Sequence, residues 1–222
     1  VGGSSPSGRT KNMKQINVLE IIEEFKQKEN KIFKKITCES IVVYLWLKDE
    51  YQKGDIKNNK LFQFVFRSFY GLDNAGLSDK QKEKYFELLA TKETDLEAIL
   101  LELYKLPTLR SKGEHSIQFS FATKLLHTID NTKPIFDAEV STVIHKTRSG
   151  DSKEGKIKSA KEIYSDLESA YQKLLFSKEV KKIISRFRSK FCEKTNGITD
   201  EKVLDFLIWA LGKLKRKENQ LE

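Results

Sequence analysis

Apolar residues recur at intervals of three and four positions along nearly the whole chain, and long strict alternation of apolar and polar residues is absent. This spacing is typical of helices that bury one face. Clear apolar stripes lie at positions 18–25, 41–46 and 61–69, and a longer one lies at 203–214. The pattern predicts an all-α protein of roughly eight to ten helices.

Capping signals place several of the predicted helix ends. Ser78 with Gln81 and Thr94 with Glu97 have the spacing of capping boxes, in which each side chain bonds the other residue's backbone N–H. Gly71 follows the third apolar stripe and predicts its end. The other predicted boundaries are a stop at Pro107, a helix over 116–129, a charged loop over 147–156 and a last helix that begins at Thr199 or Asp200.

Composition predicts one folded unit behind a short tail. Residues 1–12 are rich in Gly and Ser, lack hydrophobic periodicity and are interpreted as a disordered tail or an expression remnant. Residues 13–222 are enough to bury one core shared by two helical lobes. No internal repeat is found in them.

The chain lacks the features of a membrane or secreted protein. Its longest apolar run, at positions 41–47, is too short to cross a bilayer. No signal-peptide pattern stands at the start of the chain. Cys38 and Cys192 offer neither metal-ligand spacing nor a disulfide framework. We therefore expect a cytoplasmic monomer with no metal, no cofactor and no membrane partner.

The charge balance favours a polyanionic partner. The 222 residues include 41 Lys and Arg against 32 Asp and Glu, for a net charge of +9. Nucleic acid is the most common partner of such a protein, although a lysine-rich solvated surface is an alternative explanation. The basic residues gather around one acidic residue, Asp137, and these are Lys105, Arg110, Lys112, Lys124, Lys133, Lys146 and Arg148.

The segment KPIFDAEVSTVI, at positions 133–144, places Asp137 behind an apolar pair and at the start of a predicted helix. An Asp at this position is either an ordinary helix cap or a catalytic carboxylate, and the two roles are compatible. Glu139 lies two residues further on and is expected to point to a different face, which disfavours a carboxylate pair or a metal site. The three histidines are not spaced as metal ligands.

The longer segment LYKLPTLRSKGEHSIQFSFATKLLHTIDNTKPIFDAEVSTVI has the order helix, Leu-Pro hairpin, helix, Pro-containing turn and Asp137. This layout resembles the helix-hairpin-helix DNA glycosylases, and the resemblance covers residues from about Leu61 to His145. KPIFDAEV is similar to the Pro-Ile-Leu-Asp segment of adenine glycosylases. The hairpin differs from the family pattern because it is longer and keeps a single glycine, Gly113.

The resemblance implies a two-lobed helical fold with the hairpin and the catalytic segment at about 94–146. It implies that Asp137 stabilises the oxocarbenium ion formed when an N-glycosidic bond breaks, and that it activates water. Family members that also cut the strand carry a lysine early on the helix after the hairpin, where this chain has no amine at 117–120, so hydrolysis without lyase activity is expected. The residues expected to bind DNA are Arg110, Lys112, Gly113, Ser116 and Lys124.

A glycosylase also holds the extruded base and fills the gap that the base leaves in the duplex. The turn at 69–76 is expected to supply the gap-filling residue, Asp73 or Asn74, with Leu72 as the apolar alternative. Aromatic and amide side chains suit a base pocket, although aromatic residues at helical spacing are also explained by core packing. The residues after Gly71 are likewise explained by an ordinary turn. The candidate pocket residues are Gln63, Phe66, Tyr70, Phe136, Asp205 and Trp209.

These observations predict a DNA glycosylase that acts on double-stranded DNA containing a damaged or modified base, in repair or in defence against phage. The sequence does not assign the excised base, and an oxidised purine, an alkylated base and a modified viral cytosine are all compatible with it. One alternative is a helical nucleic-acid-binding module without catalysis, and another is a basic protein-interaction domain.

Overall fold

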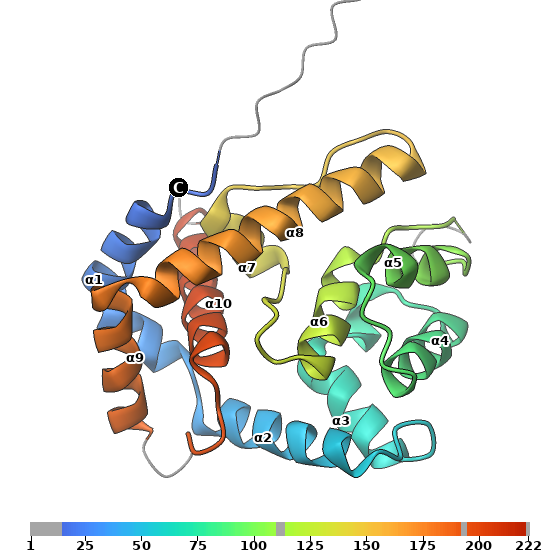
Figure 1. The fold of residues 1–222 in the computed structure, drawn as a ribbon, viewed down its shortest axis with the longest axis horizontal. Helices are drawn as coiled ribbons and strands as arrows, with labels where there is room; N and C mark the ends of the chain where they lie inside the picture. The colour runs from blue at the N-terminus through green and yellow to red at the C-terminus, as the bar shows by residue number, and fades with distance from the viewer. Residues whose placement is uncertain (1–14, 110–113, 192–194, 221–222) are drawn as a thin grey trace, which may run out of the picture.

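The computed structural model describes residues 15–109, 114–191 and 195–220, and these residues form helices and no strand (Figure 1). The all-α prediction is therefore confirmed for this part of the chain. The helices are α1 (Val18–Lys35), α2 (Cys38–Lys53), α3 (Lys60–Tyr70), the short 3-10 helix η1 (Asp73–Ala75), α4 (Asp79–Ala90), α5 (Leu96–Tyr104), α6 (Phe119–Ile129), α7 (Ala138–Ile144), α8 (Lys153–Phe176), α9 (Lys178–Lys190) and α10 (Asp200–Glu218).

The helices pack in two groups. Helices α1, α7, α9 and α10 contact one another on one side, and α4, α5 and α6 contact one another on the other side (Figure 1). The pair α2–α3 runs along one edge between the groups, and α8 runs along the opposite edge, where it contacts both α5 and α10. The segment between α6 and α7 crosses from one group to the other, and Asp137 lies at its end. That the two groups form one folded unit stays a prediction.

Local hydrogen bonds explain the helix ends that were predicted correctly. Gln81 donates its backbone N–H to the Ser78 hydroxyl at 3.3 Å, and the Ser78 N–H donates to the Gln81 side chain at 3.1 Å, which completes the predicted capping box. The buried Gln81 amide also donates to the carbonyls of Leu103 and Leu106 at 3.1 Å, so it joins α4 to the end of α5. Gly71 ends α3 with φ at 70°.

Three predicted boundaries are corrected. Asp95, and not Thr94, caps α5, because its carboxylate accepts the Glu97 N–H at 2.9 Å. The helix expected over 116–129 begins at Phe119, after a non-helical stretch with no side-chain cap. The loop expected over 147–156 ends early, since Ser152 caps α8 and the helix begins at Lys153.

Helix α7 packs very closely against α10. A Cβ built on Gly212 of α10 would lie 2.4 Å from the carbonyl oxygen of Glu139 in α7, so only glycine fits between the two backbones. Because Asp137 caps α7, this contact also determines how far the Asp137 carboxylate lies from α10.

Within residues 15–109, 114–191 and 195–220, no helix is both long enough and apolar enough to span a membrane.

Candidate functional site

Asp137 is held firmly at the N-terminus of α7. Its carboxylate accepts the backbone N–H of Val140 at 3.0 Å, as a helix cap does. The preceding residue is tied to α6 by the Thr123 hydroxyl, which lies 3.0 Å from the Phe136 N–H and 3.2 Å from its carbonyl oxygen. The Phe136 ring stacks on Phe119 at 4.5 Å between centroids. Phe136 therefore attaches the residue next to it, Asp137, to α6.

The Asp137 carboxylate faces a pocket of about 390 Å³. The walls come from the start of α2, the end of α3, α6, the start of α7 and α10. This volume is in the range of small-molecule sites. The structure brings together here five of the residues singled out from the sequence, namely Asp137, Lys124, Tyr70, Asp205 and Trp209.

Most charges around the pocket have partners of opposite sign. Lys202 and Asp205 form a buried ion pair at 2.7 Å. Glu139 pairs with Arg216 at 2.9 Å and with Lys213 at 3.4 Å. Two charged groups remain, because neither Asp137 nor Lys124 has an ion-pair partner among the residues that the structure describes.

Lys124 is 9% exposed and lines the Asp137 pocket, so it does not lie on the open surface of the protein, where a DNA-binding role would place it. Its amine donates to the Tyr70 carbonyl at 3.0 Å and lies 5.0 Å from the centre of the Phe121 ring. Burial lowers the pKa of the Lys124 amine, and the negative charge of Asp137 works against that shift. The lysine sits in the segment FSFATKLL, whose apolar residues surround the helix, and this was the sequence signal for a buried helix.

The pKa of the Asp137 carboxyl is raised above its ordinary value of 3.8. Burial is the main cause, and the positive charge of Lys124 and the N–H of Val140 oppose it. A carboxylate that has lost part of its hydration interacts more strongly with a cation placed beside it than a solvated carboxylate does. The site can therefore stabilise positive charge on a bound molecule.

Three residues proposed for the pocket lie elsewhere. Gln63 donates its side-chain amide to the carbonyls of Ile56 and Lys57, at 2.9 and 2.8 Å, and so holds the turn before α3. Phe66 has no exposed surface and packs among other aromatic rings of the core. Phe136 is buried against Phe119 and does not line the pocket.

The turn after α3 has no arrangement that favours one gap-filling residue. Asp73 is ion-paired with Lys82 at 2.9 Å and lies 3.4 Å from Arg67, although it is exposed. Asn74 is also exposed. Leu72 has no exposed surface, so the apolar alternative is wrong for this conformation of the chain. The base-gap role of Asp73 or Asn74 stays a prediction.

Part of the predicted DNA-binding hairpin is outside the described residues, namely Arg110, Lys112 and Gly113. On either side of these residues, the Thr108 N–H donates to the Glu114 carbonyl at 3.0 Å. Ser116 is partly exposed, beside Arg148, Lys153 and Lys156 in a hollow of about 360 Å³. Ser116 precedes the start of α6 by three residues, so it does not stand at a helix N-terminus, as the helix expected over 116–129 would have placed it.

Sequence reasoning missed several pocket residues. Glu139 lines the same pocket as Asp137, because Asp137 stands outside the helix as its cap and the two side chains do not follow helical spacing. Lys202, Lys213 and Phe69 also line the pocket, and nothing near them in sequence indicated it. No group of three His, Cys, Asp or Glu side chains suited to a metal ion is found among the described residues.

Comparison of the chain with models of protein families, with curated proteins and with solved structures finds no match.

Proposed function

We propose that the protein is a DNA glycosylase that hydrolyses the N-glycosidic bond of a damaged or modified base, with the pocket at Asp137 as its base-binding site. The observation that carries this proposal is that Asp137 and Lys124, neither of which has an ion-pair partner among the described residues, lie in one pocket with aromatic walls. A flipped base needs flat apolar surfaces, which Phe69, Tyr70 and Trp209 offer. The sugar then lies at the pocket mouth, beside the carboxylate.

Asp137 is assigned the catalytic role. As the bond to the base breaks, positive charge develops on the sugar, and a fixed carboxylate stabilises that charge more in the transition state than in the ground state. Asp137 is pre-positioned by the Val140 N–H and by the attachment of Phe136 to α6. Its second function is to orient the water that attacks the sugar.

The direct test is incubation of the protein with a panel of duplexes that each carry one modified base, followed by detection of abasic sites. The panel contains oxidised purines, alkylated bases and modified cytosines, with an unmodified duplex as control. Release of one or more bases at a rate above the unmodified control supports the proposal. Binding to the duplexes without release of any base supports the alternative of a nucleic-acid-binding module.

A specific observation favours a second candidate, a glycosylase that also cuts the strand. The sequence predicted no amine in the usual lyase position, but the Lys124 amine lies in the same pocket as Asp137. A desolvated lysine with a lowered pKa is a better nucleophile at neutral pH than an exposed one. The neutral amine can attack C1′ of the sugar, and the base leaves with the electrons of its bond to C1′. Loss of an amine proton and opening of the C1′–O4′ bond then form the Schiff base.

Borohydride trapping separates the two candidates. For the hydrolase we expect little covalent adduct and strand cleavage only after added alkali. For the lyase we expect a covalent adduct that Lys124→Gln abolishes and that Lys133→Gln, the control, leaves unchanged, because Lys133 pairs with Glu168 and does not line the pocket. An adduct that survives Lys124→Gln contradicts the assignment of Lys124 as the nucleophile.

The pH dependence of base release is a further expected result. Only ionised Asp137 stabilises the sugar cation, so the rate is full above the raised pKa of Asp137 and falls as the pH drops through it. Because the Lys124 charge lowers that pKa, Lys124→Met is expected to move the acidic limb to higher pH. Single-turnover rates from neutral to acidic pH measure the acidic limb in the wild type and in Lys124→Met. The same midpoint in both proteins would contradict the electrostatic coupling between Lys124 and Asp137.

We also expect the surface beside Ser116 to bind the DNA backbone. Lys153 and Lys156 flank Ser116 in the same hollow, and replacing both by Gln is expected to lower the slope of log affinity against log salt by about two. Affinity should fall similarly for all duplexes, since phosphate contacts carry no sequence information. The control replaces Lys181 and Lys182, exposed on α9, by Gln. Equal losses in both variants mean that net charge alone attracts the DNA.

A further inference from the structure

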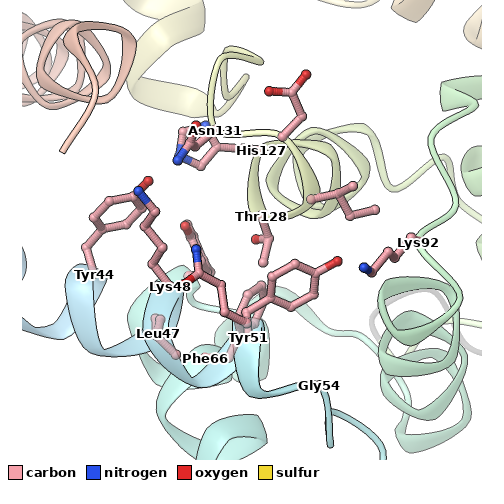
Figure 2. Close-up of a pocket in the computed structure, with 14 residues that line it drawn as sticks. Tyr44, Leu47, Lys48, Tyr51, Gly54, Phe66, Lys92, His127, Thr128 and Asn131 are labelled. Carbon is pink, nitrogen blue, oxygen red and sulfur yellow. The ribbon is translucent and has the colours of Figure 1, made fainter. Parts of the chain in front are cut away.

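A second cavity of about 440 Å³ lies apart from the Asp137 pocket (Figure 2). Its walls come from α2, from the end of α3, from the end of α6 with the residues that follow it, and from Lys92 between α4 and α5. Neither Asp137 nor Lys124 lines this cavity, and Tyr70 is shared by both pockets.

His127 lines this cavity and leaves one ring nitrogen without a hydrogen-bond partner among the described residues. The side chain is 1% exposed, and its Nδ1 lies 2.7 Å from the Lys133 carbonyl oxygen. A carbonyl oxygen only accepts, so Nδ1 carries the hydrogen and Nε2 is left with a lone pair. Nε2 is buried and has no hydrogen-bond partner among the described residues.

The imidazole stays neutral at physiological pH. Burial and the nearby charge of Lys202 lower the pKa of His127 to about 4. The opposing influences are the Asp205 and Asp130 charges and the hydrogen bond to Lys133. A buried acceptor without a partner is unfavourable, so a ligand that donates an N–H to Nε2 would gain by satisfying it.

The rest of the cavity suits a flat ring that carries an anionic group. Tyr44 and Tyr51 provide aromatic surface, and Asn131 lines the cavity with them. Lys92 reaches toward the cavity on the side opposite Tyr44 (Figure 2). Its amine has no ion-pair partner in the described part of the chain, and the side chain is exposed.

We propose that this cavity binds a nucleotide, with its base among the aromatic side chains, an N–H of the base donated to His127 Nε2, and its phosphate at Lys92. A nucleotide unites a flat ring, an edge with N–H groups and a phosphate in one molecule. The nucleotide is either a free nucleoside monophosphate or the phosphorylated end of a DNA strand. The inference does not rest on the glycosylase proposal, because the cavity contains neither of the residues that carry it.

The test uses the full chain and measures two quantities. Titration calorimetry gives the dissociation constants for the four deoxynucleoside monophosphates, the matching nucleosides and inorganic phosphate. The ¹⁵N resonance of His127 Nε2 in the wild-type protein is followed in the same titrations, because a lone pair that gains a hydrogen bond changes its chemical shift. We expect saturable binding of at least one monophosphate together with a shift of this resonance.

The variants locate the phosphate and the base. Lys92→Gln is expected to weaken monophosphate binding about tenfold and to leave nucleoside binding unchanged, since it removes one charge-assisted contact. Lys80→Gln is the matched control, because Lys80 is exposed on α4 and lines neither cavity. Asp137→Asn should leave nucleotide binding unchanged. A strand with a 5′-phosphate that also shifts the His127 resonance identifies DNA ends as the source, and monophosphates alone identify free nucleotides.

Three results overturn the proposal. One is the failure of every monophosphate to give saturable binding together with a shift at His127 Nε2. Another is inorganic phosphate binding as tightly as any monophosphate, which indicates a simple anion site. The third is nucleotide binding that is lost in Asp137→Asn, which places the nucleotide in the other pocket.

Discussion

Asp137→Asn is expected to lower the rate of base release by about three orders of magnitude, because the substitution removes the charge that stabilises the sugar cation and keeps the shape of the side chain. Asn caps a helix about as well as Asp, so the hydrogen bond from Val140 is retained and the free energy of unfolding should change by less than about 0.5 kcal/mol. Affinity for the modified duplex should stay close to that of the wild type. Single-turnover base release, duplex binding and denaturant unfolding measure the three quantities.

Asp95→Asn is the matched control. Asp95 caps α5 as Asp137 caps α7, and its carboxylate likewise accepts a backbone N–H, but it does not line the Asp137 pocket. The control should therefore release bases at the wild-type rate. Wild-type excision by Asp137→Asn would remove the carboxylate from the mechanism, and a large loss of stability in that variant would show that the charge itself supports the fold.

Gly212→Ala is expected to destabilise the protein by at least about 2 kcal/mol. The new methyl group would lie 2.4 Å from the Glu139 carbonyl oxygen and 2.6 Å from its carbonyl carbon, so the α7 backbone must move away from α10. Alanine is a better helix former than glycine by about 1 kcal/mol, which offsets only part of this loss. Because Asp137 caps α7, base release should fall together with stability.

Gly155→Ala in α8 provides the comparison. A Cβ at Gly155 would lie 3.3 Å from the Ser152 hydroxyl oxygen, which accepts the Gly155 N–H as the cap of α8, and 3.5 Å from the Cα of Gly150. This contact requires a much smaller movement than the one at Gly212, and the helix-forming gain of alanine opposes its cost, so the free energy of unfolding should change by much less than in Gly212→Ala. Equal effects of the two substitutions in a urea titration would contradict the close packing of α7 on α10.

Features that depend on nearby residues could be predicted from the sequence. The Ser78–Gln81 capping box, the end of α3 at Gly71 and the cap at Asp137 each form from groups a few residues apart. Where two adjacent residues can both cap a helix, the capping pattern does not determine which one does, as with Thr94 and Asp95 at the start of α5. The resemblance to helix-hairpin-helix glycosylases stays a prediction, which rests on the order of the hairpin, the helix and Asp137.

The composition of the site could be predicted only in part. Asp137, Tyr70, Asp205 and Trp209 line one pocket, in which Asp205 forms an ion pair with Lys202, and their roles toward a base stay a prediction. The sequence could not show which aromatic residues line the pocket and which lie in the core. An apolar stripe on a helix predicts that its residues are buried, but it does not predict what they pack against. Phe66 is an example, because it is buried among rings of α3 and α4 and does not reach the site.

The sequence by itself determined that this chain is helical, where several helices begin and end, and that a carboxylate caps the helix after the Pro-containing turn, because short-range periodicity and capping depend on residues close in the chain. Only the tertiary structure decided which charges are neutralised. Lys202 with Asp205 and Glu139 with Arg216 are paired, whereas Lys124 faces the pocket beside Asp137 and His127 keeps an unpaired nitrogen. The physical reason is that burial and ion pairing depend on how distant helices pack, and no spacing along one helix encodes that packing.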